Sequence, residues 1–520
     1  RPRPVKTGLV IPTTHWDRDW YWPFERFRVK LIELFRVVKQ LWRRHPGYRF
    51  VTDGQAVIVE DYLEAVPQDR ALLCRMGRQG RLRVGPLYVQ SDLYCTGGEA
   101  FIRNMLIGAA VAREFNALQN VVYLPDTFGH VPCMPMLVRG FGYDTYVFMR
   151  GLPPSFPSRL RFFRWRAPDG SWVQVFRLRD GYGNAARLGV LPGGGPAAAA
   201  GAAPRFSMDK AVERFEAAMA KQVDRQGPPY VLIAGVDHQI PQPQLPSIMR
   251  NCSRQHRHFR FSDWDDVATA MRRRTGRWRT YRGECHGSGA SSILGGTVST
   301  RVYLKQANAD AERMLVQVAE PADAVAKLLG YDHPAYGSLH AAWKRLLRAH
   351  PHDDMTGCSV DAVHRENEMH IVCASQAADA VRRRMAHHLI EHFGGQVQGD
   401  GRYAFFVFAA QAGKDVRRVV VKADYEGRHT WGDTRPSRCY SIVDDEGRAV
   451  PFRELSRGRS VEHPHPVVNL ELRPRARPFT FRRFFIEPRP RWLRATVGSE
   501  LENNRLHVSI RPNGTIDVRD

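Results

Sequence analysis

The sequence predicts a multidomain protein of class α/β + α + β: an N-terminal parallel β/α, barrel-like domain, a three-helix bundle and a C-terminal β-rich region. Three observations support this order. Short apolar runs alternate with amphipathic segments up to about residue 265, long helical stripes fill residues 300–393, and strand patterns separated by turns follow residue 399. With 520 residues the chain is also too long for a single core.

The N-terminal region repeats strand, helix, strand, which is typical of a parallel sheet covered by helices. We expect a buried strand at TGLVIPTT and then a helix over residues 26–44, whose apolar positions fall on one face. Further strands are expected at RFVTDG, RLRVGPLYVQ, NVVYLPDT, TYVFMRG and YVLIAGVD. Because parallel strands end at a common edge, polar residues that follow these runs should gather there.

The middle region carries three amphipathic stripes, at residues 304–318, 339–347 and 363–393, which predict a helical bundle. The first stripe consists of Leu304, Ala307, Ala311, Met314, Leu315 and Val318. Beyond it, FFVFAA, RRVVVKADY, CYSIVDD, FTFRRFFIE and RLHVSIRPNGTIDVRD predict β-strands. The sequence stops directly after a strand pair, so we expect an incomplete last β-domain. We place the domains at 1–285, 286–395 and 396–520.

Composition excludes some classes of function. The net charge is +24, but the basic residues are mostly Arg, are spread along the chain and lack interleaved aromatic platforms, so we expect no nucleic-acid partner. No apolar run approaches the ~18 residues of a membrane helix, and no signal peptide is visible, so we expect no membrane partner. The eight cysteines form no CxxC pattern, which indicates reduced thiols and a cytoplasmic location.

Four segments carry chemistry: THWDRDWYWPF, YLPDTFGH, AGVDHQIPQP and HPHDDMTGCS. In the first, His15 and Asp17 flank a Trp in extended chain, so both side chains point to the same side. A capped turn is the alternative explanation of these two residues. Trp20 offers an aromatic face for a sugar ring, or else packs in the core.

The second and third segments each place an Asp at the end of an apolar run. Asp126 suits a nucleophile, a metal ligand or both, with a helix N-cap as the alternative, and His130 suits a supporting hydrogen bond. Asp237 or His238 suits the general acid/base. Together the segments offer a His₂Asp₂ metal set and a second carboxylate, which suits the cleavage of a glycosidic bond beside a metal ion.

The fourth segment concentrates polar residues at a helix end. Two His and two Asp within five residues are hard to explain by packing, and all four are candidate metal ligands: His350, His352, Asp353 and Asp354.

With these residues the chain resembles the glycoside hydrolase family 38 α-mannosidases, in particular the bacterial branch that includes mannosylglycerate hydrolases. The resemblance spans roughly residues 9–393 and extends to further segments: DGQAVIVEDYLE, GPLYVQSD, GEAFIRNML, STRVYLKQAN and CSVDAVHRE. It implies an α/β domain, a three-helix bundle and a β-sandwich region, which in this chain would be only partial. It also implies a retaining α-mannosidase that forms a mannosyl-enzyme.

The resemblance also implies roles for single residues. One divalent ion, Zn²⁺ with Co²⁺ or Ca²⁺ as alternatives, would be held by His15, Asp17, Asp126 and His352. Asp126 would also be the nucleophile and Asp237 the acid/base. Trp20, Arg150 and Asp353 would line the sugar subsite. Where the family usually has a His two residues before its first ligand, this chain has Thr13, which would alter the support of that ligand.

The expected substrate is an α-mannosyl oligosaccharide or a small mannoside, and mannosylglycerate is the alternative. Family members are longer than this chain, so we expect a 520-residue form to have little activity. Two other readings remain open: a metal-dependent hydrolase of another class, such as an amidase or deacetylase, and a basic binding protein. The oligomeric state, including a homo-oligomer, is also open.

Overall fold

The computed structural model shows the chain as two compact units, residues 1–323 with 332–383 and residues 324–331 with 384–520. All candidate site residues lie in the first unit. The structure describes residues 6–191, 205–253, 257–275, 278–289, 292–332, 335–394, 403–408, 419–424, 439–459, 466–472, 481–489, 499–502 and 505–519.

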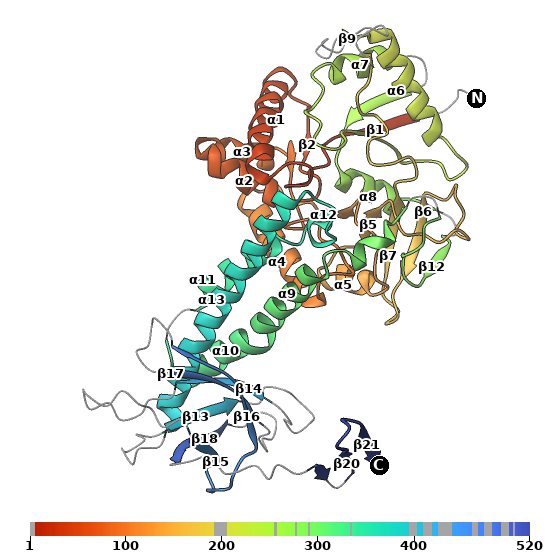
Figure 1. Cartoon of the computed structure of the whole chain (residues 1–520). Helices are drawn as coiled ribbons and strands as arrows, with labels where there is room; N and C mark the ends of the chain where they lie inside the picture. Colours follow the sequence, from red (N-terminus) through yellow and green to blue (C-terminus); the bar gives the residue numbers. More distant parts are fainter. Residues whose placement is uncertain are drawn as a thin grey trace, which may run out of the picture. The chain divides into compact units, whose positions relative to one another are not determined.

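The sheets of the first unit are built mainly from parallel strands (Figure 1). β1 (Lys6–Pro12) lies between β10 (Tyr230–Ala234) and β11 (Arg257–Phe261), and both pairings are parallel. A five-stranded sheet has the order β12-β6-β7-β5-β4, in which only β6 and β7 pair antiparallel. Its strands are β4 (Val122–Leu124), β5 (Thr145–Phe148), β6 (Phe162–Arg166), β7 (Trp172–Arg177) and β12 (Thr280–Arg282).

Two short strand pairs complete this unit: β2 (Phe50–Val51) with β3 (Leu82–Arg83), and β8 (Val190–Leu191) with β9 (Arg205–Phe206). The strands expected from the apolar runs are therefore present. The antiparallel pair β6–β7 was not among them. Its strands are separated by a short turn, which leaves no room for a crossover helix and so permits only an antiparallel connection.

Helices cover these sheets: α1 (Phe24–Arg44), α2 (Val57–Ala65), α3 (Arg70–Arg78), α4 (Gly98–Glu114), α5 (Met134–Gly140), α6 (Met208–Gln222), α7 (Leu245–Cys252) and α8 (Trp264–Arg272). β1 is buried on both faces, because Val10 packs in one apolar cluster with residues of α6 and α7 while Leu9 and Ile11 pack in another with residues of α8. Burial on both sides explains the continuous apolar run LVI, which is usual for a strand inside a parallel sheet.

The helical region after residue 300 contains α9 (Val302–Arg313), a π-helical turn (Met314–Ala319), α10 (Glu320–Leu328), α11 (Tyr336–Leu347), α12 (His352–Met355) and α13 (Asp361–Gly394). The three helical stripes are thus confirmed, with one correction to the first. Ala307 is exposed, and Asn308 is buried in its place. Asn308 can be buried because its side chain has a hydrogen-bonding partner: Asn308 Oδ1 lies 2.6 Å from His350 Nε2.

The second unit contains antiparallel sheets, with strand orders β13-β18-β15, β14-β17-β16 and β19-β20-β21. The strands are β13 (Tyr403–Phe408), β14 (Val419–Asp424), β15 (Cys439–Asp444), β16 (Phe452–Arg459), β17 (Pro466–Leu472), β18 (Phe481–Arg489), β19 (Glu500–Glu502), β20 (His507–Ile510) and β21 (Ile516–Arg519). Ile442, Leu470 and Ile486 belong to one buried cluster, so the first two sheets share a core in the manner of a sandwich.

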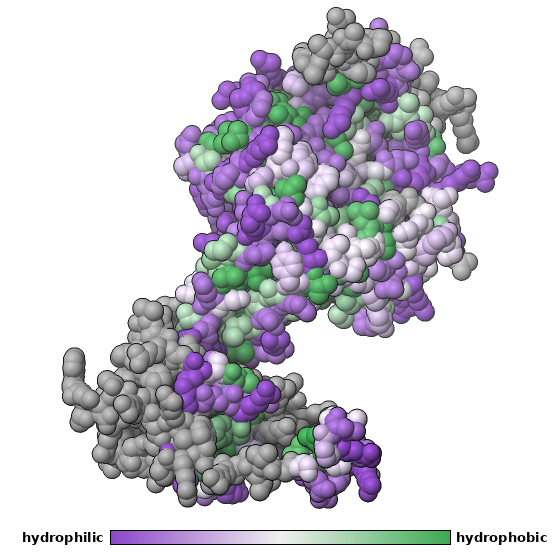
Figure 2. Space-filling model, viewed as in Figure 1, coloured by the Kyte–Doolittle hydropathy of each residue, from purple (hydrophilic) through white to green (hydrophobic). Residues whose placement is uncertain are grey.

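The visible surface of the first unit is largely hydrophilic (Figure 2). Hydrophilic residues are spread over most of the visible face of the first unit, with apolar residues scattered between them (Figure 2). Among the described helices, none has the length and apolar character needed to cross a membrane.

Candidate active site

The candidate site forms where the parallel strands end. The β1–β10 ladder continues past both strands, with His15 N donating to Val236 O at 3.3 Å and His238 N donating to His15 O at 2.8 Å. These bonds place Asp237 directly beside His15 in the backbone register. Asp126 follows β4 by two residues.

Gly235 permits this close approach of two strand ends. A Cβ atom at that position would lie 1.9 Å from the carbonyl oxygen of Thr13. Any side chain there would therefore push β10 away from β1 and separate Asp237 from His15. The glycine in the segment AGVD is thus required by packing.

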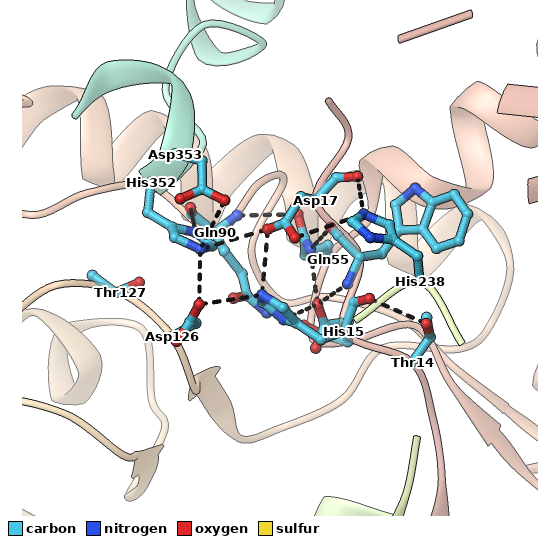
Figure 3. A network of polar contacts seen from close by, with 12 residues as sticks. Thr14, His15, Asp17, Gln55, Gln90, Asp126, Thr127, His238, His352 and Asp353 are labelled. Atoms are coloured by element: carbon cyan, nitrogen blue, oxygen red, sulfur yellow. Dashed lines mark hydrogen bonds and ion pairs between the residues drawn. The ribbon is translucent and has the colours of Figure 1, made fainter. Parts of the chain in front are cut away.

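Four side chains from three parts of the chain converge on one point (Figure 3). His15 Nε2 lies 3.3 Å from Asp17 Oδ1 and 3.8 Å from Asp126 Oδ2. His352 Nε2, from the start of α12, lies 3.5 Å from each of the same two oxygens. All four residues are buried, with exposures between 2% and 9%.

The spacing of these atoms suits a small cation. Ligand atoms at the usual Zn–N and Zn–O distances of a tetrahedral site lie about 3.3–3.6 Å apart, close to the separations observed here. Within the described part of the chain, the buried Nε2 atoms of both His15 and His352 have no hydrogen-bond partner. These two imidazole nitrogens and the facing oxygens of Asp17 and Asp126 form a donor set that a divalent ion would satisfy.

The charges of the cluster are strongly coupled. Burial disfavours the charged form of His352, but the carboxylates of Asp353, Asp126 and Asp17 outweigh this effect and raise its pKa to about 9. Burial likewise opposes the charge on His15, and its acidic neighbours still raise its pKa. Conversely, although burial alone would raise the pKa of Asp17 and Asp126, the nearby imidazoles lower both. A bound cation would take the place of the protons on the imidazoles.

Arg150 fixes one side of Asp126. Its guanidinium nitrogens Nε and Nη2 lie 2.7 Å and 2.5 Å from Asp126 Oδ1. Because Oδ1 is held by this pair, Oδ2 is the oxygen that faces the two histidines. Arg150 is thus close to the cluster, as expected for a residue of this site.

Asp237 and His238 differ in their surroundings. His238 is buried with its ring stacked on Phe27, its Nε2 lies 3.0 Å from Asp17 O, and its Nδ1 lies 3.2 Å from Tyr21 Oη. Asp237 is only partly buried and interacts with the hydroxyl of Tyr182, whose ring lies 4.7 Å from that of His15. Of the two residues, Asp237 is the less buried, while His238 Nε2 lies 3.6 Å from Asp17 Oδ2.

The two remaining subsite candidates are Trp20 and Asp353. The Trp20 ring is partly buried and lies 6.4 Å from the His238 ring, and its carbonyl accepts a hydrogen bond from Val360 N at 3.0 Å. Asp353 Oδ2 lies 4.0 Å from His352 Nε2. Burial raises the pKa of Asp353 to about 6, although His352 opposes the shift.

Other polar residues of the four segments do not join the cluster. His130 is buried beside Tyr146, with Nδ1 2.8 Å from its hydroxyl oxygen, and burial lowers its pKa to about 3. His350 bonds Asn308 instead of the cluster. Asp354 pairs with Asp19, and burial raises the pKa of both.

Sequence reasoning assigned no role to the residues that support the histidines. His15 Nδ1 lies 3.0 Å from Asp53 Oδ2, and His352 Nδ1 lies 3.3 Å from Gln90 O. Asp53 follows β2 within TDGQ, the same strand-then-Asp pattern that drew attention to Asp126, so this signal was available. Thr13, by contrast, donates its hydroxyl to Val51 O at 2.9 Å.

Two known domains match most of the first unit. The glycosyl hydrolases family 38 N-terminal domain matches residues 7–284, and the alpha mannosidase middle domain matches residues 292–389. The chain belongs to glycosyl hydrolase family 38. Relatives include a "Putative mannosylglycerate hydrolase" of Halalkalibacterium halodurans, 31% identical over 69% of this chain and 40% of the relative. Alpha-mannosidase 2C1 of Homo sapiens is 26% identical over 68% of this chain and 32% of its own.

A crystal structure of an alpha-mannosidase from Enterococcus faecalis V583 has the same fold as this family 38 chain. Its TM-score is 0.82 with 25% identity, and the match covers 99% of this chain and 60% of that one. The chain therefore spans about half the length of the relatives it matches. The multidomain fold class expected from the sequence is confirmed.

Proposed function

We propose that this chain carries the catalytic centre of a retaining α-mannosidase that uses one divalent metal ion, most simply Zn²⁺. The observation that carries the proposal is the convergence of His15, Asp17, Asp126 and His352 at separations suited to a tetrahedral ion. Membership of family 38 supports mannoside hydrolysis as the reaction class. A bound ion would supply a Lewis acid that orients the adjacent 2- and 3-hydroxyls of mannose.

The two steps of the reaction follow from the carboxylates. In the first, the Asp126 carboxylate attacks the anomeric carbon while Asp237 donates its proton to the departing glycosidic oxygen, giving a mannosyl ester and a free alcohol. In the second, the Asp237 carboxylate takes a proton from water, whose oxygen displaces Asp126 and releases mannose. Arg150 would hold Asp126 in position through its pair with Oδ1.

The surrounding residues suit binding of one sugar. Trp20 would pack its partly buried ring on an apolar sugar face, and Asp353 would accept a hydroxyl hydrogen bond beside His352. His238 would support Asp17 from behind, since its Nε2 faces the Asp17 carbonyl. We further propose the domain limits 1–285, 286–395 and 396–520, in which the second domain donates His352.

The candidate substrate is an α-mannosyl oligosaccharide or a small mannoside, and the leaving group is the alcohol that its glycosidic bond releases. The relative named as a mannosylglycerate hydrolase favours mannosylglycerate as a second candidate substrate. The test is to assay p-nitrophenyl α-mannoside and mannosylglycerate, with and without a chelator, and to trap the enzyme with a fluorinated mannosyl reagent. Labelling of Asp126 is expected. Chelator-insensitive activity would contradict the metal site. Chelator-sensitive hydrolysis without any labelled intermediate would contradict the retaining mechanism and favour a metal-activated water in a hydrolase of another class.

A further inference from the structure

The two histidines of the cluster are held by one polar scaffold. His15 presents Nε2 to the cluster and Nδ1 to Asp53, whose Oδ2 lies 3.0 Å away. His352 has the same orientation, with its Nδ1 3.3 Å from Gln90 O and its backbone N donating to that carbonyl at 3.0 Å. In both rings the nitrogen away from the cluster is therefore the one that meets the scaffold.

Asp53 is the centre of this scaffold. Besides His15, its Oδ2 accepts hydrogen bonds from Trp16 N at 2.9 Å and from Gln55 Nε2 at 3.0 Å. Asp53 is fully buried and holds a φ of 53°, a left-handed conformation that is strained for a residue other than glycine. The following Gly54, at φ 70°, completes the turn that aims the carboxylate at His15.

Gln55 and Gln90 join the two histidines through this centre. Gln90 Nε2 donates to Asp53 O at 2.7 Å, and Gln90 N donates to Gln55 Oε1 at 3.2 Å (Figure 3). Gln55 Nε2 also donates to Trp16 O at 2.8 Å. The support of His15 and that of His352 are therefore parts of one buried network in the segments that follow β2 and β3.

We propose that Asp53 is a positioning residue that fixes His15 with the hydrogen on Nδ1 and the lone pair on Nε2, so that Nε2 faces the metal point. A neutral imidazole has one N–H and one acceptor, and a carboxylate at Nδ1 selects this arrangement and makes Nε2 a better donor to a cation. The inference rests on the proposed function, because it assigns Asp53 a part in metal binding. It also identifies Asp53 as the side chain that supports His15, whereas the Thr13 hydroxyl bonds Val51 O.

A purely structural role would give a different result. If Asp53 served only to close the turn after β2, an Asn would replace it well, since Asn also adopts left-handed backbone and retains an acceptor for Trp16 N. Asp53→Asn removes only the charge and one of the two acceptor oxygens. Metal affinity, measured apart from turnover, therefore separates positioning from folding.

The experiment measures Zn²⁺ and Co²⁺ binding to the whole chain by competition with a chromophoric chelator. Asp53→Asn should weaken Zn²⁺ binding about 10–100-fold while leaving the metal-free thermal unfolding close to that of the unaltered chain. The matched control is Asp263→Asn. Asp263 is also buried, caps α8 and pairs with Arg49 at 2.9 Å, but it lies outside the cluster. The Zn²⁺ affinity of the Asp263→Asn chain should therefore change by less than about 3-fold.

Gln55→Met provides a second variant should Asp53→Asn fail to fold. It keeps the carboxylate and removes one donor to it, and a several-fold loss of affinity is expected. Unchanged Zn²⁺ affinity in a folded Asp53→Asn chain, or in Gln55→Met, would overturn the inference while leaving the proposed function intact. If the unaltered chain bound neither ion, the proposed function would fail first. These two failures are distinguishable.

Discussion

Removal of the Asp126 carboxylate should abolish turnover and weaken metal binding together. In the structure one oxygen of this group faces His15 and His352, and the other is held by Arg150. Asp126→Ala deletes a ligand oxygen and the nucleophile in one change. It also leaves the guanidinium of Arg150 unpaired beside the site, where its charge would repel a divalent ion.

The magnitude follows from the number of ligands. Structural zinc sites bind with about 10–16 kcal/mol, so one ligand of four is worth about 3 kcal/mol, which corresponds to a loss of affinity on the order of 100-fold. Loss of a catalytic nucleophile costs on the order of 10⁴–10⁶ in kcat. The fall in turnover should therefore greatly exceed the fall in affinity, and excess Zn²⁺ should not rescue the variant.

The assay pairs chelator competition for Zn²⁺ with hydrolysis of p-nitrophenyl α-mannoside. Asp144→Ala is the matched control, since Asp144 also pairs with an arginine, at 2.7 Å from Arg272 Nε, but lies outside the cluster. It should keep its affinity within about 3-fold. Zn²⁺ binding that is unchanged in Asp126→Ala, or turnover restored by added Zn²⁺, would refute the dual role of Asp126.

Three further predictions concern the acid, the pH dependence and the metal. Asp237→Ala should spare activated aryl mannosides and impair unactivated ones, because only the latter need protonation of the leaving group; equal losses in kcat on both would argue for His238 instead. Burial lowers the pKa of His130 to about 3 and so keeps its imidazole neutral in the folded chain. As pH falls below about 6.5, this residue therefore binds a proton in the unfolded chain but not in the folded chain. Below that pH, this group should lower the free energy of unfolding by about 1.4 kcal/mol per pH unit. Denaturant titrations of the metal-free chain at pH 7.5 and 5.5 should therefore show a smaller loss of stability in His130→Gln than in the unaltered chain. An equal loss in both would disprove this role of His130. Saturating Zn²⁺ at about 100 times its Kd should stabilise the chain by about 2.7 kcal/mol, and a chelator should reverse this in thermal scans; identical unfolding with and without metal would count against the site.

The candidate site could be located from the sequence because it follows a rule of parallel sheets. His15, Asp126 and Asp237 each follow an apolar run, and these runs become strands of two sheets whose carboxyl ends both lead to the cluster. The HPHDD segment stood out because its composition has no packing explanation. Proximity in the fold was thus implied by local patterns alone for these residues.

Selection among the polar residues of each segment required the tertiary structure. His350 and His352 are two residues apart and look alike in sequence, yet only His352 reaches Asp17 and Asp126, while His350 bonds Asn308. Asp237 and His238 are likewise adjacent, but the positive φ of His238 turns its ring toward Phe27. Which side chain faces the site depends on backbone torsion and on partners far away in sequence.

The sequence by itself determined the strand and helix order and the segments that carry the chemistry, because these depend on local periodicity and composition. Only the tertiary structure decided that Asp53, Gln55 and Gln90 form one scaffold beneath two histidines that lie over 300 residues apart. The physical reason is that a hydrogen bond is directional and short-ranged. Its partners are defined by where folded strands end in space, and no single segment of sequence contains that information.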